Sequence, residues 1–217
     1  MSLRRHSALV FAALLLGTAA PSAAQQRGAP SGDACLQDRL SPDVAERLRE
    51  LAIRAAASGV PRQLVCEKVN EGVSKGVRGD RLLRGIAGYV DRLAQARELA
   101  GPRAPAAVLE AVAEALERGL PPERIRSFLV ANPNPRRSVL GLRVVADLDE
   151  IGVPIDEAMR GVNAGLDRGL RGERLLALSA AVRQRVRRGD SPSAALRDEL
   201  GDRRSPADSR RRSDRRP

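Results

Sequence analysis

The sequence has almost no aromatic side chains and only one histidine. Its 217 residues include no tryptophan, one tyrosine, two phenylalanines and the single residue His6. His6 lies in an N-terminal stretch that we expect to be removed, so the mature chain has no imidazole for acid–base catalysis, a nucleophilic triad or a histidine metal site. With so few aromatics, the core must consist of Leu, Val, Ile and Ala.

Cysteine is also scarce, because the chain has only Cys35 and Cys66. Without a C-x-x-C motif or histidine partners, the two make no plausible zinc site. In an oxidising compartment they are more often paired than free, which predicts a disulfide bridge between them. The alternative is that Cys66 is simply a small buried apolar residue.

The first 24 residues have the three parts of a secretory signal peptide. Arg4 and Arg5 form a charged start, Ala8 to Ala20 is an apolar run, and Ser22 and Ala24 are small residues before a cleavage point at Gln25. A membrane anchor is the alternative, but the run is shorter than the roughly 20 apolar residues that span a bilayer. We therefore expect a signal peptide at 1–24, a flexible segment at 25–40, and a periplasmic or secreted mature protein with no transmembrane segment.

The net charge of +11 is concentrated at the ends of the chain. The signal segment carries +2 and residues 203–217 carry +5, which leaves an ordinary +4 for the rest. We expect this tail to be disordered, because it has no apolar face. Its arginines are predicted to bind an anionic envelope surface, or alternatively only to keep the protein soluble; they are Arg203, Arg204, Arg210, Arg211, Arg212, Arg215 and Arg216. Export places the chain away from nucleic acid.

Apolar residues recur at helical spacing through the middle of the chain, and no segment alternates in the manner of a strand. The pattern predicts an all-α fold, a single helical domain at 41–202 with an irregular helical-repeat or bundle arrangement. Ser41, Asp80 and Ser138 are expected to start three of the helices. The nine expected helices occupy residues 41–59, 61–76, 80–101, 105–119, 123–131, 138–152, 154–168, 173–188 and 191–200.

One part of the sequence occurs twice. Residues 59–83 match residues 152–176 without gaps at twelve of 25 positions, a shift of 93 residues. This predicts an internal duplication of 59–96 in 152–189, with Met159 at the position equivalent to Cys66. The repeated glycines are expected just beyond helix ends, where a left-handed backbone penalises a Cβ; they are Gly59, Gly76, Gly119, Gly152 and Gly169. A phosphate cradle is disfavoured, because no strand precedes them and no P-loop spacing follows.

The sequence shows no catalytic, cofactor-binding or metal-binding motif. Carboxylates are abundant, including Glu67, Glu71, Asp147, Asp149 and Glu150. A glycosidase needs two carboxyl groups at a defined separation with one raised pKa, and its saccharide site would ordinarily offer aromatic surface. Solvated helix faces are the simpler interpretation of these acids.

The pattern (K/R)-G-(V/L)-x-x-(D/E)-R-(L/I) occurs at 75–82, 118–125 and 168–175. Together with the signal peptide and the helix pairs, it resembles uncharacterised exported all-helical proteins of GC-rich Gram-negative bacteria. The resemblance implies a periplasmic location and no catalytic residues. It leaves two functions open: a non-enzymatic helical scaffold that binds an envelope protein or surface, and a cell-envelope hydrolase that uses carboxylates.

Overall fold

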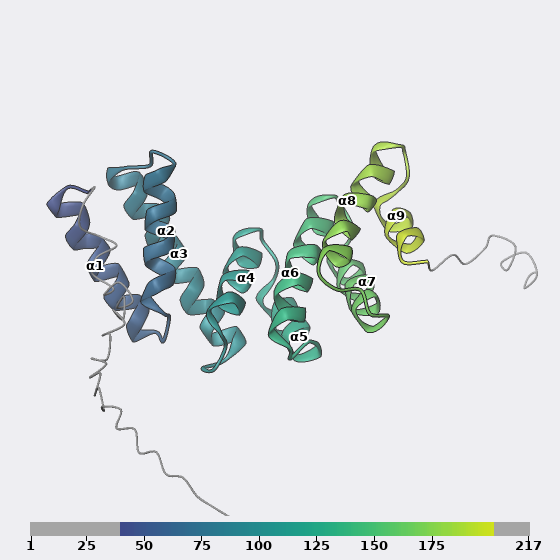
Figure 1. Cartoon of the computed structure of the whole chain (residues 1–217), viewed down its shortest axis with the longest axis horizontal. Coiled ribbons are helices and arrows are strands. Elements are labelled where there is room, and N and C mark those ends of the chain that lie inside the picture. The colour runs from purple at the N-terminus through teal and green to yellow at the C-terminus, as the bar shows by residue number, and fades with distance from the viewer. Residues whose placement is uncertain (1–39, 202–217) are drawn as a thin grey trace, which may run out of the picture. The chain divides into compact units, whose positions relative to one another are not determined.

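The computed structural model describes residues 40–201, and within them the chain forms nine α-helices and no strand (Figure 1). The predicted all-α fold is confirmed. The predicted signal peptide, Cys35 and the arginine-rich tail lie outside the described residues. The helices are α1 (Pro42–Ala57), α2 (Arg62–Ser74), α3 (Gly79–Ala100), α4 (Ala106–Glu117), α5 (Pro122–Ala131), α6 (Pro135–Glu150), α7 (Ile155–Asp167), α8 (Glu173–Arg187) and α9 (Pro192–Glu199).

Two of the three expected helix starts differ from the structure. Ser41 is the N-cap of α1, but Asp80 lies inside the first turn of α3, whose N-cap is Arg78. Helix α6 begins three residues before Ser138, because the Asn134 side chain accepts hydrogen bonds from the backbone N–H groups of Arg136 and Arg137. The Ser138 hydroxyl is buried and donates to the carbonyl of Pro135. The N-cap of α6 is therefore Asn134, and not Ser138 as the sequence had suggested.

Helices α1, α3, α4, α6 and α8 pack in succession, each against the next in that order. Helix α2 covers α1 and α3, α5 packs against α3, α4 and α6, and α7 and α9 pack against each other and against α8. Their shared core is aliphatic apart from Phe128 and Tyr89, as the composition requires. Its largest fully buried side chains include Leu48, Leu93, Leu109, Leu142 and Leu175.

The 93-residue shift relates helix boundaries as well as sequence. Helix α2 maps onto α7 with both ends in register, and α1 maps onto α6 in the same way. The duplicated unit therefore begins one helix earlier than residue 59, where the sequence match starts. The α1–α6 relationship is carried by burial rather than identity: positions 45, 48, 52 and 55 are buried, and so are positions 138, 141, 145 and 148.

The two copies diverge after their third helix begins. Helix α3 has 22 residues, whereas α8 has 15 and ends before Gly189, where φ is 104°. The equivalent position in the first copy is Ala96, which is fully buried inside α3. A helix-breaking glycine in one copy and a core alanine in the other therefore give the second copy an additional short helix, α9.

All five repeated glycines have positive φ, from 72° at Gly59 to 93° at Gly152. Each directly follows the C-cap residue of a helix, and Lys75, Arg118 and Arg168 are three of those C-caps. Cations at these positions interact favourably with the negative end of the helix dipole. Within residues 40–201, none of the helices is both long enough and apolar enough to span a bilayer.

Candidate binding groove

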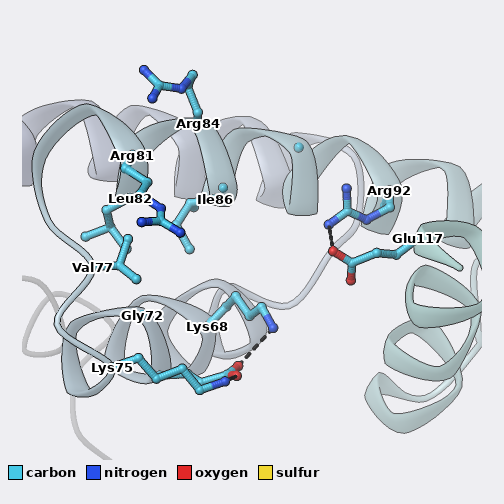
Figure 2. A pocket seen from close by; sticks show the side chains of 13 residues that line it. Lys68, Gly72, Lys75, Val77, Arg81, Leu82, Arg84, Ile86, Arg92 and Glu117 are labelled. Carbon is cyan, nitrogen blue, oxygen red and sulfur yellow. Dashed lines mark hydrogen bonds and ion pairs between the residues drawn. The ribbon is translucent and has the colours of Figure 1, made fainter.

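A pocket of about 370 Å³ lies between α2 and α3, with the end of α4 at its border (Figure 2). Its floor is apolar and consists of Val77, Leu82 and Ile86. Its volume falls within the ordinary range of roughly 300–1,000 Å³ for ligand pockets. We call it the α2–α3 groove; its other lining residues are Lys68, Glu71, Gly72, Lys75, Arg81, Arg84, Gly85, Gly88, Arg92 and Glu117.

Two glycines inside α3 keep the groove open. Gly85 and Gly88 lie three residues apart in the interior of the helix, so they share one of its faces. A Cβ added at Gly85 would meet no atom within 4 Å, and one at Gly88 would meet only Arg92, at 3.4 Å. Glycine costs about 0.5–1 kcal/mol relative to alanine at such positions. Packing within the described chain therefore does not explain why these two positions hold glycine instead of alanine.

The groove is strongly cationic, with five basic side chains and two acidic ones. The Nζ of Lys68 lies 2.9 Å from Glu71, which also binds Lys75, and Arg92 pairs with Glu117 at 3.0 Å. Arg81 and Arg84 form no ion pair with any residue of the described part. Figure 2 shows Arg81 directed toward α2, whereas Arg84 points away from it. Unbalanced positive charge therefore faces the groove.

The basic neighbours also control the ionisation of Glu71. Hydrogen bonds from Lys75 and then Lys68 lower its pKa to about 2. A general acid at neutral pH needs a raised pKa instead. Glu71 therefore serves as a permanent anion that positions the two lysines.

A second group of polar residues lies where α2, α3 and α4 meet. Burial and the nearby charge of Glu67 raise the pKa of Glu110. Burial, followed by the charges of Glu110 and Glu67, also raises the pKa of the Tyr89 hydroxyl. Lys68 lies over the Tyr89 ring, with its Nζ 5.4 Å from the ring centre.

Two of the remaining acids singled out from the sequence, Asp147 and Glu150, belong to a structural ion-pair network, and Asp149 is not part of it. Arg118 at the end of α4 donates to Asp147 and to Glu150 on α6, each at 2.7 Å. Its side chain is only 18% exposed, and Asp147 also accepts from Ser179 of α8. These bonds lower the pKa of Glu150 and raise that of Arg118. The network connects α4, α6 and α8, and none of its residues lines the α2–α3 groove.

The hinge glycines could be predicted from the sequence, whereas the residues of the groove were not predicted. Gly76 and Gly169 border helix ends, whereas Arg81, Gly85, Gly88 and Arg92 were not recognised as a set. A signal was present, because the second copy has Leu178 at the position of Gly85 and Ala181 at that of Gly88. A glycine that replaces an apolar residue of the other copy indicates space that one copy leaves open.

Cys66 is buried on α2, 8% exposed. Its predicted partner Cys35 lies outside the described residues, so the bridge remains a prediction. No group of three or more Cys, His, Asp or Glu residues suited to a metal ion occurs in 40–201. The chain matches no known protein family, no curated protein and no solved structure.

Proposed function

We propose that the protein is a non-enzymatic helical scaffold of the cell envelope that binds a partner protein through the α2–α3 groove. The observation that carries this proposal is the combination of an apolar floor, five basic residues and two interior glycines in one open groove. Such a groove has the chemistry for recognition and not for bond cleavage. Its two acids, Glu71 and Glu117, are both neutralised by cations.

The alternative function, a hydrolase that uses carboxylates, is favoured by one observation. Glu110 has a raised pKa and interacts electrostatically with Glu67, and a carboxyl group with a raised pKa near a second carboxyl group is a feature of glycosidases. Against this, the groove that could hold a polymer is lined by neither residue. Of the acids that do line it, Glu71 has a lowered pKa.

The location in the envelope rests on the N-terminal signal pattern and on the tail. Seven arginines and two acids in residues 203–217 give this segment a charge of +5. Near an anionic lipid surface each cation contributes about 1 kcal/mol, and this attraction weakens at high salt. The expected result is binding to anionic vesicles at 0.1 M salt that is lost at 1 M salt. A chain that ends at Asp202 and binds equally well would reduce the tail to a solubilising role.

Chemical cross-linking in envelope extract tests the scaffold proposal. The wild-type chain should form a complex of defined mass with a partner protein, and should release no product from envelope polymers. The matched variant Glu110→Gln should behave identically in both assays, because the proposal gives Glu110 no role in binding or chemistry. Release of product by the wild type that is lost in Glu110→Gln would contradict the proposal and support the hydrolase.

A further inference from the structure

The second copy of the duplication shows what fills a groove of this kind. Helix α9 packs against both α7 and α8, the counterparts of α2 and α3. A Cβ built on Gly161 of α7 would lie 3.0 Å from Leu196 and 3.0 Å from Leu200 of α9. One built on Gly165 would lie 3.5 Å from Leu200. Helix α9 thus places two leucines against the glycine face of α7.

Two basic residues hold α9 in this position. Arg185 of α8 pairs with Asp198 and lies 3.7 Å from Glu199, both on α9. Arg168, at the end of α7, donates a hydrogen bond to the carbonyl of Leu200. The occupant of the second groove is therefore a short helix that presents leucines to its floor and carboxylates to an arginine.

The four residues of the second copy that hold α9 correspond to lining residues of the first. A shift of 93 positions takes Gly161, Gly165, Arg168 and Arg185 to Lys68, Gly72, Lys75 and Arg92, and all four of these line the α2–α3 groove. In the first copy α3 continues to Ala100, where the second copy turns back at Gly189. The next helix, α4, packs against α3 and reaches the groove only at its border, where Glu117 pairs with Arg92. The α2–α3 groove is therefore the counterpart of the α9 seat.

Three differences alter the fit. Leu82 of α3 covers Gly72, the counterpart of Gly165, because a Cβ built on Gly72 would lie 2.6 Å from Leu82. Lys68 in place of Gly161 takes up room on the α2 side, at the position that Leu196 and Leu200 contact in the second copy. The α3 side has more space, because Gly85 replaces Leu178 and Gly88 replaces Ala181. Lys68 in place of Gly161 and Glu71 in place of Ala164 add one charge of each sign. An occupant is thus expected closer to α3, with carboxylates like those of α9.

We infer that the α2–α3 groove docks a short amphipathic helix of a partner protein, with leucine-like residues on one face and carboxylates beside them. The acids contact Arg81, Lys75 and Arg92, and the apolar face covers Leu82 and Ile86. Arg81 lies in the first turn of α3, where the helix dipole disfavours a cation, so a bound carboxylate relieves that repulsion. The chain's own tail is excluded as occupant by its charge of +5. This inference rests on the proposed scaffold function and specifies its partner.

A synthetic peptide of residues 190–201, DSPSAALRDELG, is the probe. It is titrated into the full mature chain while backbone amide chemical shifts are followed. The expected result is a saturable shift of the amides of Gly72, Gly85 and Gly88, with weaker binding by a peptide carrying Asp198→Asn and Glu199→Gln. Absence of a shift at all three glycines at millimolar peptide would overturn the inference. So would shifts confined to Gly161 and Gly165, since the peptide would then only replace α9.

Two variants of equal charge separate the groove from general electrostatics. Arg81→Glu should weaken peptide binding at least about fivefold, because an attraction becomes a repulsion. Arg174→Glu is the matched control, because Arg174 is the exposed counterpart of Arg81 in the first turn of α8 and should change affinity less than about twofold. Equal weakening by both variants would overturn the inference. Gly85→Leu should abolish binding by filling the groove.

The peptide titration tests the docking inference, and the cross-linking experiment tests the scaffold function, so either can be contradicted without the other. If the wild-type chain still forms its envelope complex while the peptide leaves the groove glycines unshifted, the docking inference is wrong and the scaffold function stands. If the peptide binds as expected but the wild-type chain forms no envelope complex, the groove is a helix receptor and the proposed envelope function is wrong.

Discussion

Gly141 of α6 lies directly against the ring of Phe128 on α5: a Cβ built on the glycine would fall 2.4 Å from Cζ of that ring. Phe128 is 1% exposed, so the ring is enclosed by the rest of the chain. Gly141 occupies the position equivalent to Leu48 in α1, which is fully buried. The second copy has therefore exchanged a large side chain on one helix for an aromatic ring supplied by another.

This contact predicts opposite effects for two glycine-to-alanine changes. Gly141→Ala should lower the free energy of unfolding by about 1–2 kcal/mol, because overpacking outweighs the better helix propensity of alanine. Gly85→Ala should raise it by about 0.5–1 kcal/mol, because its Cβ meets nothing within 4 Å. Urea unfolding of the two variants measures both. Changes of the same sign would contradict the packing described for α5 and α6.

The hinge glycines should respond to backbone strain alone. Gly169 has φ 91°, and a Cβ there would meet no atom within 4 Å. Gly169→Ala should therefore lower the free energy of unfolding by on the order of 1 kcal/mol, through conformation and not through a clash. Gly76→Ala, at φ 76° and also without a neighbour, is the matched variant in the other copy. If neither variant were destabilised, the left-handed hinges would be disproved.

Sequence reasoning succeeded where a local rule applied and failed where distant packing decided. Helical spacing and glycine–proline punctuation predicted all nine helices, because both act within a few residues. The α1–α6 equivalence was not visible, because burial at 45 and 138 can be met by Ala in one copy and Ser in the other. The groove could not be predicted either, since it depends on which helix follows α3 and how that helix packs.

Glu110 should make stability fall as pH rises. Burial raises its pKa in the folded chain, so the carboxyl ionises more readily when the chain unfolds. Stability is then lost as pH increases from the unfolded pKa, about 4.3, through the higher folded pKa. Glu110→Gln should remove this loss and be more stable than the wild type at pH 7, with a smaller difference at pH 4. If the variant and the wild type differed by the same free energy of unfolding at both pH values, Glu110 would not be desolvated in the folded chain.

The Cys35–Cys66 bridge would close a loop of about 30 residues and contribute roughly 3 kcal/mol if it is unstrained. Peptide mapping of the exported protein without reductant should recover the linked pair. Reduction should lower the midpoint of thermal unfolding, and Cys35→Ser should reproduce that lower midpoint without reductant. Recovery of the two peptides unlinked would contradict the prediction, as would a midpoint unaffected by reductant.

Photo-cross-linking in intact cells tests the account's central claim, that the α2–α3 groove binds a helix of an envelope partner. A photoreactive residue replaces Arg84, which lines the groove but is given no contact with the acids, in one chain and its counterpart Ala177 in another. The linked partner peptide is sequenced by mass spectrometry. The expected result is an adduct from position 84 alone that the 190–201 peptide removes, and a partner segment with leucine-like and acidic residues at helical spacing. Equal adducts from both positions, or a partner segment without acidic residues, would contradict it.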